Sequence, residues 1–159
     1  MGSLAKLWPG QAPALLLLAS AGALIFAFVA QYGFGLEPCV LCLYQRWPYA
    51  GVILLMGLAV AMPGLRPRLL LLAALVFAVG GGIGVYHVGV EQHWWAGTAE
   101  CTGGGAAQTV EELRRQLLGR KPARCDEAAL VFLGLSMAGW NVVLSGALAG
   151  LSFSARNRA

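Results

Sequence analysis

Four long apolar stretches, separated by short polar connections, run along this chain. They cover residues of about 13–32, 42–62, 69–90 and 128–151, and each has about the 20 residues that a helix needs to cross a bilayer. The first stretch is longer than the core of a secretory signal peptide, roughly 7–15 residues, so we expect it to remain as a membrane helix. The pattern predicts an all-α integral membrane protein, a four-helix transmembrane bundle that forms a single membrane domain over residues 1–159.

Two polar connections, at about 33–41 and 91–127, lie on the same side of this predicted bundle. In the longer one, Thr109 and Glu112 have the spacing of a capping box, and Val110, Leu113 and Leu117 fall on one face of the short helix that follows. Such a pattern is typical of an amphipathic helix on the membrane surface, and equally of a loop helix packed against the bundle. The sequence leaves both interpretations open.

Two features within the apolar stretches predict local departures from regular packing. Pro48 lies in the first turns of the second stretch and is expected to kink it, which membrane helices tolerate. The third stretch contains four close glycines, Gly80, Gly81, Gly82 and Gly84. They permit close approach of helices or leave space for a flat ligand, and close packing is the simpler explanation.

Composition supports the membrane assignment. Of the 159 residues, 58% are hydrophobic and only 11% are charged, and the mean hydropathy is +0.70. Soluble domains carry about 25% charged residues, so a lipid bilayer is the expected surrounding. The net charge of +4 is modest and the basic residues form no stripe, so no nucleic-acid partner is predicted.

The basic residues orient the predicted bundle. One side of it carries both termini and the residues Lys6, Arg66, Arg68, Arg156 and Arg158. By the positive-inside rule this side is the cytoplasm, so residues 33–41 and 91–127 face outward. The long outward connection also contains basic residues. Acidic residues lie among them, and several are far from the membrane ends, where the rule is weakest.

The first cysteine pair has the features of a redox centre. Cys39 and Cys42 are three residues apart and follow Pro38, which suits the first position of a helix. The positive end of a helix favours thiolate. Arg46 follows Cys42 at i+4, so the two share a helix face. This arrangement predicts a redox-active pair with a neighbouring cation.

The second cysteine pair, Cys101 and Cys125, lies in the long outward connection. Four cysteines allow three disulfide pairings, and the sequence does not choose among them. In a bacterium the outward compartment is oxidising, so disulfides are expected there. Cysteines on one face can pass a disulfide between pairs by thiolate exchange. The electrons then need an acceptor that is not a thiol, and Arg46 is suited to attract a quinone carbonyl.

Together these features resemble the DsbB family of disulfide bond formation proteins. The resemblance covers essentially the whole chain and rests on residues 38–46, 86–92, 100–104, 124–128 and 132–141. A CxxC pair alone is common, whereas CxxC followed at i+4 by Arg, with a second outward pair, is specific. The resemblance implies a protein-dithiol:quinone oxidoreductase of the bacterial inner membrane, with both termini in the cytoplasm and the cysteines facing the periplasm.

The resemblance also implies a role for each cysteine. Cys101 and Cys125 would form a loop disulfide that reoxidises a DsbA-type thiol oxidase through a mixed disulfide at Cys101. Cys125, released as a thiolate, would attack the Cys39–Cys42 disulfide. Cys42 would then face a bound quinone as a thiolate, and Arg46 would assist that quinone. Ubiquinone is the implied acceptor, with menaquinone in other conditions.

Members of this family can carry a histidine near the quinone, at the outer end of the third helix. Here the candidates for contacting the quinone are His87, Glu91 and His93, and the sequence does not settle which residue fills that role. Imidazole supplies a proton or a hydrogen bond. Each histidine has an alternative explanation, a hydrogen bond to a neighbouring backbone group or to interfacial water.

Other function classes fit parts of the pattern. One is a zinc-binding membrane protein with the four cysteines as ligands, although paired CxxC motifs are usual and only one is present. We expect no metal site. Another is a quinone reductase of the vitamin K epoxide reductase type, in which the CxxC follows the loop pair, the reverse of the order here. In the simplest alternative Cys39 and Cys42 form a static disulfide, and the side chain of Arg46 only extends to the membrane–water interface.

Overall fold

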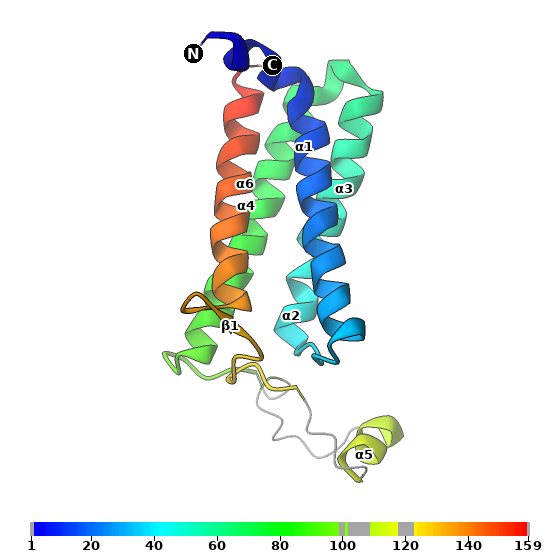
Figure 1. Cartoon of the computed structure of the whole chain (residues 1–159), viewed down its shortest axis with the longest axis vertical. Helices are drawn as coiled ribbons and strands as arrows, with labels where there is room; N and C mark the ends of the chain where they lie inside the picture. Colours follow the sequence, from blue (N-terminus) through cyan, green and yellow to red (C-terminus); the bar gives the residue numbers. More distant parts are fainter. Residues whose placement is uncertain (1, 99–100, 102–108, 118–122, 159) are drawn as a thin grey trace.

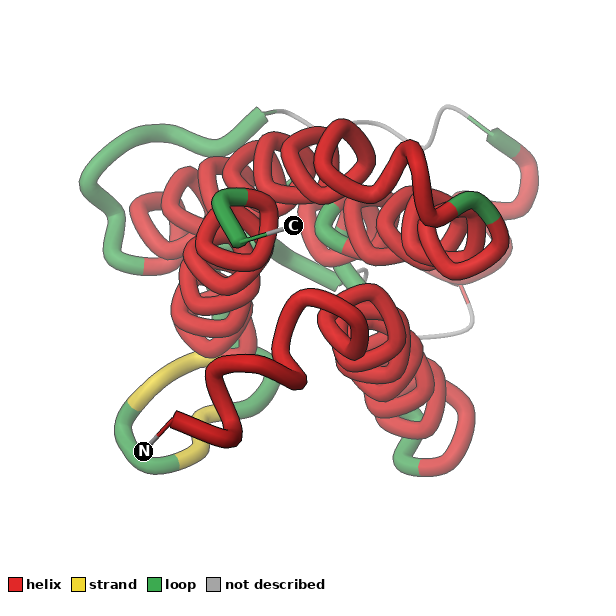
Figure 2. Tube along the Cα trace, turned by 90° about the horizontal axis from the view of Figure 1, so that it is seen from above, coloured by secondary structure: helices red, strands yellow, loops and turns green. Residues whose placement is uncertain are grey.

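Four long helices, packed side by side, form the body of this computed structural model, which describes residues 2–98, 101, 109–117 and 123–158 (Figure 1). The helices are α1 (Gly2–Phe28), α3 (Arg46–Ala61), α4 (Arg66–Glu91) and α6 (Met137–Arg156). In the view from the end that carries both termini, α4 packs against α3 and α6, and α1 packs against α3 (Figure 2). The chain has the fold of a helical membrane protein.

Short elements join and extend these helices. α1 continues into a π-helical turn, η1 (Val29–Gly33), and a 3-10 turn, η2 (Pro63–Leu65), leads from α3 into α4. The short helix α2 (Val40–Tyr44) precedes α3, and α5 (Val110–Leu117) lies in the connection between α4 and α6. α2 lies at the end of the bundle opposite to the two termini (Figure 1).

Three helical segments of the described chain are long and apolar enough to cross a membrane: Gly10–Gly33, Pro63–Glu91 and Met137–Arg156. α3 has 16 residues, about 24 Å of helix, which is shorter than a hydrocarbon core of roughly 30 Å. Together with α2 and Gln45 it reaches about 33 Å. These lengths allow four membrane crossings, which stay a prediction.

Helical hydrogen bonding is interrupted at Gln45, between α2 and α3. Pro48 explains the break, because it has no N–H for the carbonyl of Tyr44 four residues earlier and its ring crowds that carbonyl. The chain itself stays in helical conformation, since Gln45 has φ −67° and ψ −17° and its N–H bonds to the Leu41 carbonyl. The hydrogen bonding is thus broken where Pro48 predicts a kink, and the kink itself stays a prediction.

The fourth apolar stretch opens with a β-hairpin. β1 (Val131–Phe132) pairs antiparallel with β2 (Leu135–Ser136). Between them Leu133 and Gly134 have φ of 51° and 80°, positive values that a two-residue hairpin turn requires. The Ser136 side chain then caps the N-terminus of α6. The helix therefore begins later than the predicted stretch at 128–151.

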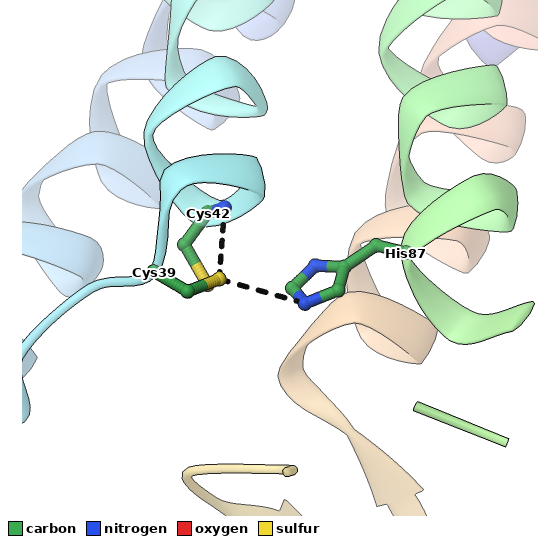
Figure 3. Close-up of side chains that lie close together, drawn as sticks. All are labelled: Cys39, Cys42 and His87. Atoms are coloured by element: carbon green, nitrogen blue, oxygen red, sulfur yellow. Dashed lines mark hydrogen bonds between the residues drawn. The ribbon is translucent and has the colours of Figure 1, made fainter. Parts of the chain in front are cut away.

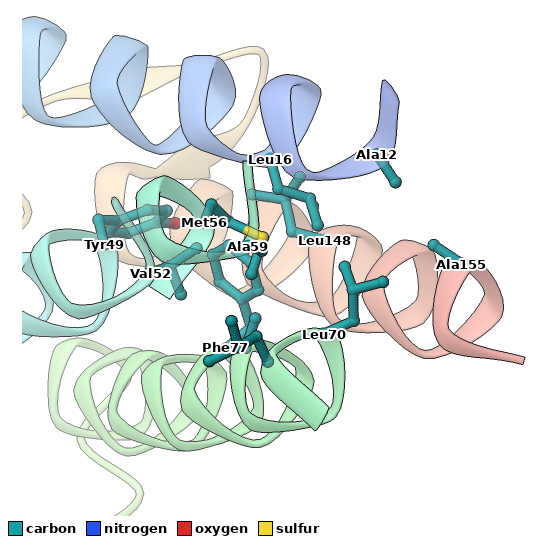
Figure 4. Packing of buried hydrophobic residues seen from close by; sticks show 12 residues of the cluster. Ala12, Leu16, Tyr49, Val52, Met56, Ala59, Leu70, Phe77, Leu148 and Ala155 are labelled. Carbon is teal, nitrogen blue, oxygen red and sulfur yellow. The ribbon is translucent and has the colours of Figure 1, made fainter. Parts of the chain in front are cut away.

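The core of the bundle is apolar and takes side chains from all four long helices (Figure 4). Its buried side chains include Leu16, Val52, Met56, Leu70, Phe77 and Leu148. A polar contact adds to it, because the Tyr49 hydroxyl donates to Asn141 Oδ1 at 2.7 Å and so joins α3 to α6. Since lipid is as apolar as these side chains, close packing and such interhelical hydrogen bonds hold the helices together.

The glycines of α4 show why this helix lies close to its neighbours. A Cβ at Gly80 would come 3.0 Å from Cβ of Pro48, and a Cβ at Gly84 would come 2.9 Å from Nδ2 of Asn141. Gly82 has nothing within 4 Å of that position. Close helix packing therefore explains Gly80 and Gly84.

Gly84→Ala is expected to destabilise the bundle by about 1–3 kcal/mol, because the added methyl group must displace Asn141 or push α4 away from α6. Gly82→Ala is the matched control on the same helix. It meets no neighbour, so stability is expected to stay the same or to rise by up to about 1 kcal/mol as glycine flexibility is lost. Thermal unfolding in detergent, followed by circular dichroism, compares the two. Equal shifts in Tm would contradict the close approach of α4 and α6.

Candidate redox site

Cys39 caps the N-terminus of α2. Its backbone is extended, with φ −72° and ψ 170°, and its Sγ accepts the backbone N–H of Cys42 at 3.3 Å. The two Sγ atoms are 2.8 Å apart (Figure 3). Pro38 therefore precedes the helix and does not occupy its first position, because the sulfur of Cys39 takes the capping role. One N–H at the start of the helix, that of Cys42, is thereby directed at this sulfur, as expected for a site that favours thiolate.

His87 of α4 points at this cysteine pair from the facing helix (Figure 3). Its Nε2 is 3.6 Å from Cys39 Sγ. Its Nδ1 is 2.7 Å from the side-chain nitrogen of Gln45, and this contact sets the orientation of the ring. His87 is only 2% exposed, so bulk water does not compete for these contacts. Of the two candidate histidines, this is the one that the structure brings to the sulfurs.

Glu91 and His93, the other candidates at this end of α4, lie in different surroundings. Glu91 Oε1 is 3.8 Å from Nε2 of His87, and its other carboxylate oxygen accepts the hydroxyl of Ser136. His93 is exposed, has φ 58°, and follows the end of the helix. Residues four apart share a helix face, so His87 and Glu91 point the same way. The structure does not bring His93 to the cysteines.

Arg46 of α3 turns toward the end of α1. Its Nη1 donates to Oε1 of Gln31 at 2.6 Å, and its guanidinium carbon lies 5.1 Å from the centre of the Phe28 ring. Gln31 belongs to the π-helical turn η1. The amide oxygen and the ring face both attract a cation, so together they hold the guanidinium in place.

Three polar residues of this site were not among the candidates predicted from the sequence: Gln31, Gln45 and Ser136. Each makes a contact that positions a candidate, namely Arg46 or His87 or Glu91. The available signal was their polarity within or beside apolar stretches, because polar side chains near the membrane interior normally have partners. Their partners come from other helices, however, and the sequence does not give those.

A cavity of about 670 Å³ opens between α1, α3 and α6 near the cysteine pair. Among the described residues, Cys42 is the only cysteine that lines it, together with Gln45, Arg46, Tyr49 and Asn141. Glu37 also lines it, and the remaining lining is apolar and comes mostly from α1, the hairpin and α6. Small-molecule sites typically have roughly 300–1,000 Å³ and a few polar groups in an apolar wall. The cavity therefore suits a mainly apolar ligand with hydrogen-bond acceptors.

Cys101 and Cys125 form a disulfide, with Cα atoms 4.8 Å apart. Both side chains are fully buried and pack with Cys39, Leu41 and Val90 in one apolar cluster. The backbone N–H of Cys125 also donates to the carbonyl of Cys101 at 2.9 Å. The structure thus selects one of the three pairings that the sequence left open, and it brings the loop disulfide into the cluster that contains Cys39.

The surroundings of Cys39 lower the pKa of its thiol to about 4. The largest cause is the hydrogen bond from the Cys42 side chain; burial opposes it, and the hydrogen bond and charge of His87 act in the same direction as Cys42. These surroundings therefore favour the thiolate of Cys39 in the reduced pair.

The reduced pair is expected to keep its thiolate at about pH 6, where an ordinary thiol with a pKa of about 8.5 is protonated, and to lose it as the pH falls through about 4. Ultraviolet thiolate absorbance of a Cys101→Ser/Cys125→Ser variant follows this titration without the loop thiols. His87→Ala is expected to move the transition to higher pH, because one group that stabilises the anion is lost. A transition near the ordinary thiol value in the unsubstituted pair would contradict the thiolate assignment.

Known proteins similar to this chain carry one recurring description. The family model described as Disulfide bond formation protein DsbB matches residues 10–155. Disulfide bond formation protein B of Xanthomonas campestris pv. campestris is 36% identical over 146 residues, which cover 86% of this chain and 84% of the relative. The protein of the same name from Albidiferax ferrireducens is 31% identical over 148 residues, 89% of this chain and 83% of the relative. The uncharacterized protein RP370 of Rickettsia prowazekii is 26% identical over 134 residues, 82% of this chain and 78% of the relative. No solved structure matches the chain.

Proposed function

The chain belongs to the DsbB family of disulfide bond formation proteins, and from this premise we propose that it reoxidises a periplasmic DsbA-type thiol oxidase and passes the electrons to a membrane quinone. Membership of the family makes it an oxidoreductase of disulfide formation in a bacterial membrane. One observation supports the finer proposal most directly. Cys39 packs with the loop disulfide, while Cys42 lines the cavity beside Arg46. The pair Cys39–Cys42, called the α2 pair below, therefore lies between the loop disulfide and the cavity.

The thiol steps are disulfide exchanges. A thiolate of the reduced partner attacks Cys101, forms a mixed disulfide and releases Cys125 as a thiolate. Cys125 attacks Cys39, and Cys42 is released as a thiolate. The partner's second thiolate then attacks the mixed disulfide, so the partner leaves oxidised and Cys101 is freed. Finally Cys101 attacks Cys125, which restores the loop disulfide and leaves Cys39 and Cys42 as the reduced pair.

Access decides which sulfur of the α2 pair Cys125 attacks. The pKa of the Cys39 thiol is lowered, so Cys39 would be the better leaving group if pKa alone decided. Cys39, however, is a buried member of the cluster that holds Cys101 and Cys125, whereas Cys42 is only partly buried, packs against that cluster and also lines the cavity. Attack at Cys39 leaves Cys42 to carry the charge beside Arg46. This division of roles supports the order of steps proposed above.

The cavity residues suit a quinone. A bound quinone, with ubiquinone proposed as the aerobic acceptor, supplies an acceptor for two electrons and two protons. Arg46, held by Gln31 and Phe28, offers N–H donors to a carbonyl oxygen. On the other side of the pair His87 stands between Cys39 and Glu91, within reach of both. It can therefore take up or hand on a thiol proton.

We further propose that the bundle crosses the membrane four times, with both termini in the cytoplasm and the cysteines in the periplasm. The termini share one end of the bundle, and α2 with its cysteine pair lies at the other (Figure 1). The distribution of basic residues supports this orientation. α5 is proposed to lie on the periplasmic surface of the membrane that the bundle crosses, because its apolar side chains Val110 and Leu113 are exposed.

A four-cysteine zinc site, one of the other classes considered, needs all four sulfurs as thiolates. The disulfide between Cys101 and Cys125 commits two of the four to each other. The vitamin K epoxide reductase type places its cysteine pairs in the opposite order along the chain. Both observations favour the thiol-to-quinone route over these alternatives.

Arg46→Ala is expected to raise the apparent KM for quinone roughly ten- to a hundredfold, because a charge-assisted hydrogen bond contributes about 1.5–3 kcal/mol. Gln31→Ala, which frees the guanidinium from its 2.6 Å hydrogen bond, is expected to raise it in the same direction by less. Steady-state assays with a soluble ubiquinone analogue measure both. Leu54→Ala, at an exposed position of α3, is the control and should leave the KM unchanged. An unaltered quinone KM in Arg46→Ala would remove this residue from the quinone site.

A further inference from the structure

Three metal-ligating atoms meet beside α2: the Sγ atoms of Cys39 and Cys42 and Nε2 of His87 (Figure 3). All three lie within 4.8 Å of one another. They come from two different helices, α4 for the histidine and the start of α2 for the sulfurs. Two thiolates and one imidazole are donors that zinc and similar thiophilic ions prefer.

Two of the distances between these donor atoms can be compared with the distances between the ligand atoms of a tetrahedral zinc ion. Zn–S bonds of about 2.3 Å and Zn–N bonds of about 2.0 Å place a sulfur and a nitrogen roughly 3.6 Å apart, and two sulfurs roughly 3.8 Å apart. Cys39 Sγ and His87 Nε2 already lie 3.6 Å apart. The two Sγ atoms lie 2.8 Å apart and must separate by about 1 Å for an ion to bind.

The surroundings of the three atoms also match those of a metal site. The backbone N–H of Cys42 bonds to Cys39 Sγ at 3.3 Å, which supports a thiolate ligand. The side-chain amide of Gln45 contacts His87 Nδ1 at 2.7 Å. The amide nitrogen of Gln45 donates to Nδ1 in this structure; a half-turn of the amide group exchanges its nitrogen and oxygen, so that the oxygen accepts an Nδ1–H and Nε2 is left free to bind an ion. Glu91 Oε1 lies 3.8 Å from Nε2.

We propose that the reduced pair Cys39–Cys42, together with His87, binds one thiophilic divalent cation such as Zn²⁺. A water molecule or Glu91 is the fourth ligand. Binding displaces the remaining thiol proton, and the two thiolates balance the charge of the ion, which suits this buried position. Oxidation of the two cysteines to a disulfide removes both thiolate ligands, so the ion binds only the reduced state. The inference goes beyond the proposed function, since it requires neither quinone nor thiol oxidase.

A bound ion competes with the thiol chemistry, because the same two sulfurs cannot coordinate it and exchange a disulfide. Micromolar free Zn²⁺ is therefore expected to slow turnover, and a chelator is expected to restore it. The site then acts as a redox-dependent metal switch, closed to the ion when the pair is oxidised.

Anaerobic titration of the full-length protein with Co²⁺ in detergent tests the site. The protein is first reduced with a phosphine, which is then removed, and the Cys101→Ser/Cys125→Ser variant keeps the loop thiols from contributing. One equivalent of Co²⁺ per chain is expected to give the visible bands of a tetrahedral ion and a sulfur-to-cobalt charge-transfer band, and Zn²⁺ is expected to displace it one for one. If the double variant does not fold, the wild type is compared reduced and oxidised, and only the reduced form should bind.

Variants of single residues assign the ligands. Cys42→Ser is expected to abolish the charge-transfer band, His87→Ala to weaken Zn²⁺ binding about a hundredfold or more, and Gln45→Ala to weaken it about ten- to a hundredfold. His93→Ala, exposed beyond the end of α4, is the matched control and should bind as the wild type does.

Absence of tetrahedral Co²⁺ bands in the reduced protein, equal binding by the oxidised protein, or unchanged affinity in His87→Ala would each overturn the site. Quinone reduction measured with a chelator present provides the separate test of the proposed function. A protein that reduces quinone but binds no Co²⁺ refutes the metal site alone. A protein that binds Co²⁺ and reduces no quinone refutes the proposed function alone.

Discussion

Cys42→Ser is expected to lower quinone reduction roughly a thousandfold or more while leaving one round of thiol exchange intact. Cys42 is the only cysteine that lines the cavity among the described residues, and it lies one helical turn before Arg46. A serine hydroxyl neither forms a disulfide with Cys39 nor carries a thiolate. The loop disulfide remains, so the variant should oxidise one equivalent of a reduced DsbA-type partner and then stop.

The measurement combines the ultraviolet absorbance of oxidised quinone with a count of partner thiols consumed. Leu43→Ala, a neighbouring and exposed position of α2, is the matched control and should keep normal turnover. Continuous partner oxidation coupled to quinone loss in Cys42→Ser would show that the electrons leave by another residue.

Cys101→Ser is expected to abolish turnover to a similar extent, roughly a thousandfold or more, by removing the sulfur that the partner attacks. In the wild type, a reduced partner that keeps only its attacking cysteine should form a covalent complex, because no second thiol is present to resolve it. Peptide mapping is expected to place the link at Cys101. The Cys101 side chain is fully buried, so complex formation should be slower than exchange with an exposed disulfide.

Non-reducing gels and mass spectrometry detect this complex. Cys125→Ser is the control, since without the loop disulfide there is no sulfur–sulfur bond to attack. A complex that maps to Cys125 or Cys39, or that forms as fast in Cys101→Ser as in the wild type, would reverse the assigned order of the cysteines.

The sequence predicted the helical membrane fold and the composition of the cysteine site for clear physical reasons. Uncharged apolar stretches of membrane-spanning length have few structural alternatives. The i, i+4 spacing of Cys42 and Arg46 places their side chains on one side of a helix wherever that helix lies. The break between α2 and α3 followed equally from local chemistry, the missing N–H of Pro48.

Other features depend on contacts between distant segments. The hairpin at β1 and β2 lies inside a continuous apolar stretch, and only the positive φ of Leu133 beside Gly134 marks its turn. His87 and His93 were equal candidates until the end of α4 at Glu91 placed one on the helix and the other beyond it. Gln31 reaches Arg46 only because a π-helical turn extends α1. The pairing of Cys101 with Cys125 likewise comes from the folded connection and not from spacing.

The most direct test of the central claim is quinone reduction by the purified protein in detergent, under anaerobic conditions, with a reduced DsbA-type thiol oxidase as electron donor. We expect loss of one oxidised ubiquinone for each partner disulfide formed, with both the donor and Cys101 required. No loss of quinone, or a loss that continues unchanged in Cys101→Ser, would contradict an electron route from the loop disulfide through the α2 pair to the cavity.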